Sequence, residues 1–185
     1  MQVLTRATSR ARRQGGGFAL AFLDLDGFKS INDRYGHAAG DEVLVTVAKR
    51  AQSIARANDT LCRLGGDEFV FVLDGSATRA KARQGASRFS AIISKPIVLT
   101  AAQGSPHVSV SASFGLAVCP KDSLEPLELM SIADGAMYQS KREKQTIVSR
   151  SGTLVLANGP GRAPLTRKVS ADKRKVSPVS HSPDR

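Results

Sequence analysis

The chain has 185 residues, of which 41% are hydrophobic and 23% are charged, a composition typical of one soluble globular domain. No apolar run approaches the roughly 18 residues needed to cross a membrane and no signal peptide is visible, so we expect a cytoplasmic protein without a membrane span. The two cysteines, Cys62 and Cys119, stand alone in apolar stretches, which excludes a disulfide scaffold and a cysteine-based zinc site.

The formal net charge of +11 is concentrated at the two ends of the chain. Residues 1–17 hold four arginines and no acid, and residues 149–185 hold eight Lys and Arg against two Asp. Because residues 18–148 are nearly neutral, we expect no specific nucleic-acid-binding domain. The Pro- and Ser-rich segment 150–185 predicts a disordered tail. Such a tail could bind RNA or anionic lipid weakly, although a solvated tail without a partner is the interpretation we favour.

Upstream of this tail, predicted helices and strands alternate. Residues 4–14 predict a helix that ends at three glycines. The apolar run 18–23, followed by acids at positions 24 and 26, predicts a buried strand. The rest predicts a short helix at 27–35, a longer helix at 39–57, a hairpin of strands 61–64 and 69–73, a helix at 77–94, strands near 97–100 and 107–118, a helix at 125–142 and a last strand near 146–149. We therefore predict an α/β domain (an α+β sandwich) over residues 1–149, with a mixed, largely antiparallel central sheet flanked by helices.

Acidic residues follow two of the predicted strands. Asp24 and Asp26 end the first strand, and Asp67 and Glu68 follow the glycine pair 65–66 in the hairpin turn. If the hairpin lies beside the first strand, these carboxylates meet at one edge of the sheet, where they suit Mg²⁺ bound to substrate phosphates. The glycines let the backbone approach a phosphate closely. Capping of the following helix is an equally good interpretation of Asp26.

Residues 65–69, GGDEF, resemble the signature of the GGDEF domain, the diguanylate cyclase family. Three further segments are similar to family segments in the same order: FLDLDGFKSINDRYGHAAGDEVL from residue 22, SASFGLAVCP from residue 111 and ADGAMYQSK from residue 133. The resemblance covers residues 4–149. It implies a fold similar to nucleotidyl cyclases and polymerase palms, and the condensation of two GTP into cyclic di-GMP and two pyrophosphates by a homodimer of facing domains.

The resemblance also implies roles for individual residues. It implies that Asp24, Asp67 and the Leu25 carbonyl hold Mg²⁺ (or Mn²⁺), and that Asp67 and Glu68 are catalytic, with Glu68 near the attacking 3′-hydroxyl. The residues it assigns to GTP are Asn32 and Asp41 for guanine and Phe28, Lys29, Arg63, Gly65, Gly66 and Lys141 around the phosphates. Phe28 also fits the core, and Lys141 also suits a helix C-terminus. An Asp that accepts from guanine N1–H and N2, with an Asn amide that donates, disfavours adenine.

The segment from Arg56 to Asp59 matches the family's inhibitory RxxD motif, in which the Arg and Asp bind the product cyclic di-GMP. A guanidinium offers its planar fork to a phosphate or a guanine edge. The tetrapeptide is common in proteins, and its position five residues before the glycine pair favours the inhibitory site here.

Two features depart from the family pattern. The opening D-x-L-T-G-L-x-N-R segment is missing, so we expect an N-terminally truncated domain with weakened stability and GTP binding. Gln145 stands where the family has a phosphate-binding Arg, and Lys144 or Arg142 could replace only its charge. Two functions therefore remain open: a Mg²⁺-dependent diguanylate cyclase, or a catalytically silent domain that binds cyclic di-GMP or acts as an interaction module.

Overall fold

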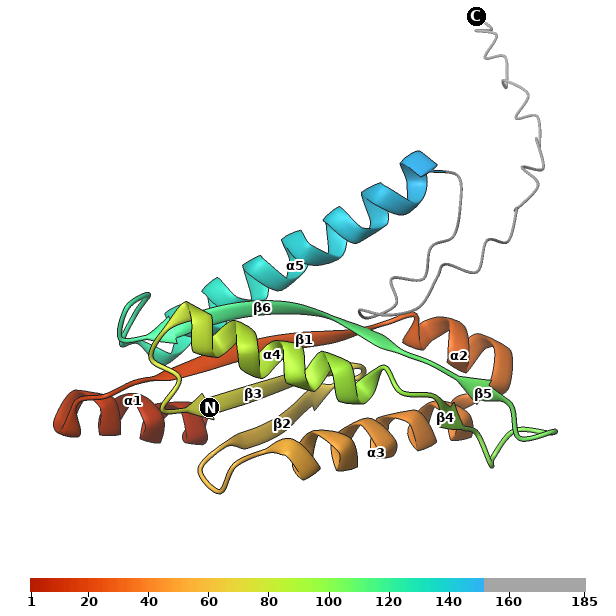
Figure 1. The fold of residues 1–185 in the computed structure, drawn as a ribbon, viewed down its shortest axis with the longest axis horizontal. Helices are drawn as coiled ribbons and strands as arrows, with labels where there is room; N and C mark the ends of the chain where they lie inside the picture. Colours follow the sequence, from red (N-terminus) through yellow and green to blue (C-terminus); the bar gives the residue numbers. More distant parts are fainter. Residues whose placement is uncertain (152–185) are drawn as a thin grey trace, which may run out of the picture.

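The structure, a computed structural model, describes residues 1–151 (Figure 1). Nearly all of the predicted tail, 150–185, lies outside the described residues. The helices are α1 (Gln2–Gln14), α2 (Phe28–Tyr35), α3 (His37–Ile54), α4 (Arg79–Ile93) and α5 (Pro126–Ser151). The strands are β1 (Phe18–Asp26), β2 (Thr60–Gly65), β3 (Glu68–Asp74), β4 (Ile97–Val98), β5 (His107–Val108) and β6 (Ser111–Cys119).

Four strands form the central sheet in the order β2-β3-β1-β6, and every neighbouring pair is antiparallel. The apolar run predicted as a buried strand is β1, which lies between β3 and β6. The short strands β4 and β5 pair only with each other. This arrangement, with helices on both faces, confirms the predicted fold class.

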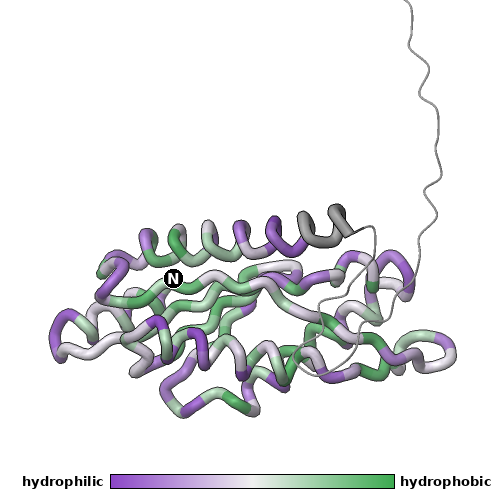
Figure 2. The backbone as a smooth tube through the Cα atoms, turned by 45° about the horizontal axis from the view of Figure 1, so that its top comes forward, coloured by the Kyte–Doolittle hydropathy of each residue, from purple (hydrophilic) through white to green (hydrophobic). Residues whose placement is uncertain are grey.

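Alternate side chains of β1 face opposite layers of helices. Ala19, Ala21, Leu23 and Leu25 belong to a core shared with α2, α3 and α4. The intervening side chains of Phe18, Leu20 and Phe22 belong to a second core shared with α1 and α5. Figure 1 shows α5 and α3 on opposite sides of the sheet, and Figure 2 shows that the central strands are the most hydrophobic part of the chain.

Helix α5 packs on the sheet through one buried stripe and one close backbone contact. Leu129, Ala133 and Met137 recur every four residues and are buried in the second core. A Cβ on Gly115 of β6 would lie 1.8 Å from the Ala133 carbonyl oxygen and 2.3 Å from the Met137 nitrogen. Only glycine fits at that position, and the contact fixes how closely α5 approaches the sheet.

The structure corrects two details of the predicted elements. The last strand predicted near 146–149 is wrong, because the backbone of α5 continues as a helix to Ser151. No glycine or proline interrupts the chain between Gly135 and Gly152, so the helix that follows the buried stripe is not stopped earlier. The strand predicted at 107–118 is divided into β5 and β6. Among the described helices, none combines the length and the hydropathy that a membrane span requires.

Candidate active site

Acidic residues of β1 and of the β2–β3 turn meet at one end of the sheet, as the sequence predicts. Asp24 lies opposite Glu68 in the antiparallel register of β1 and β3, so the two side chains are neighbours on one face. The Leu25 N–H donates to the Asp67 carbonyl oxygen over 3.2 Å, which ties the turn to β1. Asp24 is only 7% exposed. A buried carboxylate therefore lies beside two acids on the turn.

The turn that carries Asp67 is shaped by its glycines and by Arg63. Gly66 has a φ of 51°, in the left-handed region that glycine adopts without strain. The Arg63 Nε donates to the Gly66 carbonyl oxygen over 2.9 Å and closes the turn. A Cβ on Gly65 would meet no heavy atom within 4 Å, so the backbone there is open to an approaching ligand. The guanidinium of Arg63 is held beside this open backbone.

Lys141 of α5 reaches into the acidic cluster. Its Nζ donates to Asp24 Oδ1 over 2.5 Å, and the Lys141 side chain is 31% exposed. Burial raises the pKa of Asp24, the charges of Asp67 and Asp26 raise it further, and Lys141 opposes this shift. Burial alone would lower the pKa of Lys141, but Asp24, Asp67 and Asp26 raise it. The ammonium therefore stays charged beside a crowded set of carboxylates.

Asp26 does not cap a helix, and its carboxylate is already occupied by hydrogen bonds. Gly27 occupies the N-cap of α2, and no side chain caps it. Asp26 instead accepts hydrogen bonds from the hydroxyls of Ser111 and Ser113, each over 2.7 Å, and from Lys144 Nζ over 2.9 Å. Burial alone would raise the pKa of Asp26, but these three hydrogen bonds together lower it. Helix capping is therefore the wrong interpretation of Asp26.

The predicted guanine readers lie where α2 and α3 meet. The Asn32 Oδ1 is buried without a hydrogen-bond partner among the described residues. It packs against Gly40, where a Cβ would lie 1.8 Å from it and 3.2 Å from the Phe28 ring. Asp41 follows Gly40 and is exposed, as is Lys29 on the first turn of α2. Phe28 is a core residue, only 8% exposed, whose ring lies close to Asn32.

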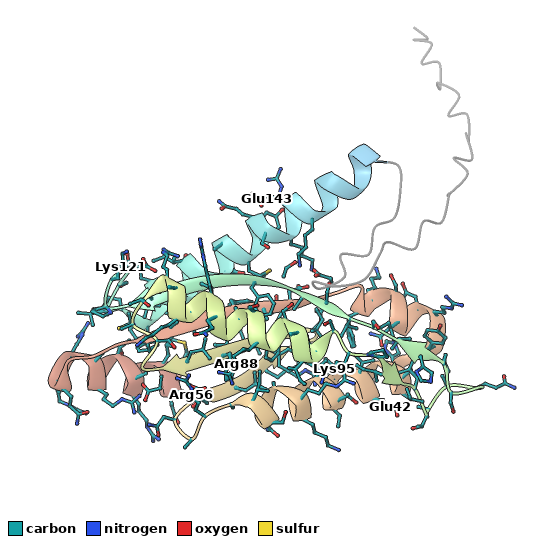
Figure 3. The ribbon with its side chains drawn as sticks, in the orientation of Figure 1. Glu42, Arg56, Arg88, Lys95, Lys121 and Glu143 are labelled. Atoms are coloured by element: carbon teal, nitrogen blue, oxygen red, sulfur yellow. The ribbon has the colours of Figure 1, made fainter. Side chains whose placement is uncertain are left out.

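Arg56 and Asp59 form the turn between α3 and β2. Asp59 accepts from the Arg56 backbone N–H over 3.0 Å and from the Asp74 backbone N–H over 2.9 Å. The Arg88 guanidinium of α4 donates to the Ile54 carbonyl oxygen at the same turn over 3.0 Å, and Figure 3 labels Arg56 and Arg88 there. Arg56 is exposed. A carboxylate can accept about four hydrogen bonds, so Asp59 keeps capacity for a ligand.

The oxygen donors at the end of β1 fit a Mg²⁺ ion that is shared with a substrate. Within residues 1–151, no three His, Cys, Asp or Glu side chains form a group that could hold a metal ion by themselves. Asp24 and Asp67 are close enough for the charge of one to raise the pKa of the other. Mg²⁺ typically keeps several waters and binds one or two carboxylates together with substrate phosphates. Two carboxylates and the Leu25 carbonyl match that preference.

Comparison with known proteins shows the family of this chain. Residues 1–146 match the family model described as "Diguanylate cyclase, GGDEF domain". The chain belongs to the GGDEF domain family. It is 43% identical over 138 residues to the bifunctional diguanylate cyclase/cyclic di-GMP phosphodiesterase MucR of Pseudomonas aeruginosa, covering 75% of this chain and 19% of MucR. It is also 43% identical over 140 residues to the diguanylate cyclase TpbB of the same organism, covering 76% of this chain and 32% of TpbB.

Solved GGDEF domains have the same fold. The crystal structure of the TpbB GGDEF domain is 41% identical in sequence with a TM-score of 0.72, and the match covers 77% of this chain and 86% of that one. The GGDEF domain of DgcB from Caulobacter crescentus, solved in complex with c-di-GMP, is 29% identical with a TM-score of 0.68, and covers 77% and 82%. The chain spans about a fifth to a third of the length of MucR and TpbB, so the match concerns the GGDEF domain alone.

The residues that hold Asp26 in this GGDEF domain were not predicted from the sequence. Ser111 and Ser113 are 85 and 87 residues away from Asp26 along the chain, and Lys144 is 118 residues away. The alternation of Asp24 with Asp26, and of Ser111 with Ser113, was the available signal, because residues two apart share one face of a strand. Pairing the two required the register of β1 and β6.

Proposed function

We propose that this GGDEF domain condenses two GTP into cyclic di-GMP and releases two pyrophosphates. The observation that carries the proposal is the meeting of Asp24, Asp67, Glu68 and Lys141 at one end of the sheet. The reaction needs the 3′-oxygen of one GTP to bond to the α-phosphorus of the other, while the bond from that phosphorus to pyrophosphate breaks. Each domain holds one GTP, so catalysis takes place between two copies of the chain, in the cytoplasm where GTP is available.

The acids divide the work by their positions. Asp24, Asp67 and the Leu25 carbonyl would hold Mg²⁺, which when bound lowers the pKa of the attacking hydroxyl and balances charge on the phosphates. Glu68 lies opposite Asp24 and would accept the proton of the 3′-hydroxyl. Lys141 has two N–H groups left besides the one on Asp24, and these can donate to phosphate oxygens. Arg63 and the open backbone of Gly65 would face the same phosphates.

The corner between α2 and α3 would select guanine. The Asn32 carboxamide, whose Oδ1 is buried without a partner among the described residues, would contact the guanine edge through its amide group, and Asp41 can accept from N1–H and N2. Adenine lacks that pair of donors and would leave both residues unpaired. Lys29, exposed on the first turn of α2, can reach the phosphates, and Phe28 supports Asn32 from the core.

The test incubates the full chain with GTP and Mg²⁺, alone and fused to a parallel coiled coil that brings two copies together. We expect cyclic di-GMP and pyrophosphate in a ratio of about one to two, with a faster rate for the fusion because two half-sites must meet. Asp67→Ala should lower the rate at least about 100-fold, as the loss of a group that stabilises transition-state charge does. Glu143→Gln, an exposed acid on α5 labelled in Figure 3, is the matched control. Absence of product from the fusion would reject the enzymatic proposal.

We further propose that Arg56 and Asp59 bind the product and inhibit the reaction. DgcB is a GGDEF domain solved with c-di-GMP, and here Arg56 is exposed beside a carboxylate already fixed by two backbone amides. Calorimetry with cyclic di-GMP should show binding that Arg56→Ala weakens about tenfold or more, since a charged hydrogen bond is lost. Arg13→Ala, an exposed arginine on α1, is the control. Equal affinity of the Arg56 variant and the parent chain would exclude this site.

The alternative function is a silent domain that only binds cyclic di-GMP. The same two experiments separate it from the enzyme. Binding that depends on Arg56, combined with no product from the dimerised chain, would establish the silent domain.

A further inference from the structure

Lys144 lies one helical turn beyond Lys141, in the region where the family's phosphate-binding Arg is replaced by Gln145. Lys144 could take over the contact of that Arg with phosphate, or it could have another role. We propose that Lys144, together with Asp26, Ser111 and Ser113, instead forms an anchor that positions Lys141. This inference rests on the proposed function, in which Lys141 contacts the phosphates of GTP.

The anchor follows from the spacing of two acids in β1 and of two lysines in α5. Asp24 and Asp26 are two residues apart in β1 and face the same side of the sheet, a step of about 6.6 Å. Lys141 and Lys144 are three residues apart in α5 and share one face of the helix, a step of about 4.5 Å along its axis. The pairs Lys141–Asp24 and Lys144–Asp26 are formed in the same order, so α5 runs beside β1 in the same direction.

The two lysines differ in how much hydrogen-bonding capacity is used. An ammonium has three N–H donors. Lys144 Nζ donates to Asp26 Oδ2 over 2.9 Å and to the Ala112 carbonyl oxygen over 2.8 Å. Lys141 Nζ makes the hydrogen bond to Asp24 at 2.5 Å. Lys144 is therefore held by both β1 and β6, whereas Lys141 retains more capacity for phosphate.

Asp26 is equally committed to this arrangement. Its Oδ1 accepts from Ser113, which is fully buried, and its Oδ2 accepts from Ser111 and from Lys144. Upstream, the contact of Gly115 with Ala133 and Met137 fixes the middle of α5. The anchor fixes the helix again beyond Lys141. Lys141 thus lies between two fixed points, and its reach to Asp24 and to the phosphates is set by both.

The test measures binding of a GTP analogue with a methylene bridge between the α- and β-phosphates, with Mg²⁺, to the full chain by calorimetry. We expect Lys144→Met and Asp26→Asn each to weaken binding by about 10-fold to 100-fold, the usual effect of removing a group that orients a ligand. The direction in which Asp26→Asn changes the affinity for the analogue separates the two explanations. Removing a negative charge near a triphosphate would tighten binding if only Coulomb forces acted. Glu143→Gln, on the same helix turn, should bind as the parent does.

A double-mutant cycle gives the second readout. If Lys144 acts through Lys141, the Lys141→Met/Lys144→Met variant binds no more weakly than Lys141→Met alone. If the loss of affinity in the double variant equals the product of the losses in the two single variants, Lys144 is a direct phosphate ligand and the anchor is wrong. Unchanged binding by Asp26→Asn would also overturn the anchor. Should Asp26→Asn fail to fold, Ser111→Ala/Ser113→Ala leaves every charge in place and should still weaken binding about threefold or more. Parent affinity in that variant would count against the anchor. A parent chain that binds no analogue would reject the proposed function instead.

Discussion

The two ends of the central sheet both carry acidic side chains, but they use them differently. At the end formed by the start of β1, Asp74 pairs with Arg10 at 2.6 Å and Asp122 pairs with Arg79 at 3.0 Å. Each of these acids has an arginine of its own. At the opposite end, burial and the charges of Asp67 and Asp26 raise the pKa of Asp24, and Lys141 and Lys144 of one helix pair with Asp24 and Asp26.

The difference shows what distinguishes a site from a set of surface ion pairs. Pairs such as Arg10–Asp74, in which the Arg side chain is 45% exposed, contribute little to stability. Crowded and buried carboxylates cost stability, because burial and like charges raise the pKa of Asp24. Such shifts mark positions where function has been favoured over stability. The comparison predicts opposite results from equivalent substitutions at the two ends.

The largest effect on turnover is expected when the same isosteric change is made at each end. Asp24→Asn should lower the rate of cyclic di-GMP formation at least about 100-fold, because the variant loses a carboxylate that we propose holds the metal ion. Asp74→Asn should leave the initial rate unchanged and cost about 1 kcal/mol of unfolding free energy or less. Rates measured on both variants in the dimerised chain check this. Comparable losses of rate in Asp24→Asn and Asp74→Asn would contradict the proposed difference between the two ends of the sheet.

A smaller effect is expected at the guanine corner. Asn32→Ala should raise the KM for GTP about tenfold, since the hydrogen bond that we propose to the base is lost, and should reduce the preference for GTP over ATP. Because the Asn32 Oδ1 is buried without a partner in the described residues, the same change should not lower the free energy of unfolding. Urea titration and steady-state kinetics measure the two quantities, with Gln52→Ala, an exposed amide on α3, as the control. An unchanged KM would remove Asn32 from the site.

The smallest effect on turnover is expected at Asp122, which is structural. Besides the Arg79 pair, it accepts from the buried Val118 N–H over 2.7 Å. Asp122→Ala should lower the free energy of unfolding by about 2 kcal/mol because that N–H loses its partner, while Arg79→Ala costs about 1 kcal/mol or less. The rate per folded molecule should stay at the parent value in both. A marked loss of rate in folded Asp122→Ala would contradict the assignment of chemistry to the other end alone.

The sequence was sufficient to predict the parts that depend on local pattern. The apolar run of β1 and the glycine turn of the hairpin predict that Asp24, Asp67 and Glu68 lie at one edge of the sheet, and the register of β1 with β3 agrees. The partners of Asp26 could not be predicted, because they depend on the register of β1 with a strand 85 residues away. The strand predicted near 146–149 is wrong because α5 continues through these residues, although the β-branched residues at 146–148 favour a strand locally. The role of 150–185 as a tail stays a prediction.

The yield of cyclic di-GMP from GTP and Mg²⁺ by the dimerised chain, followed by mass spectrometry, tests most directly whether the acids at the end of β1 carry the reaction. We expect one cyclic di-GMP for every two GTP consumed by the parent chain and by Asp74→Asn, with almost none from Asp24→Asn or Asp67→Ala. Product formed at the parent rate by Asp24→Asn, or no product from the parent chain, would contradict this expectation.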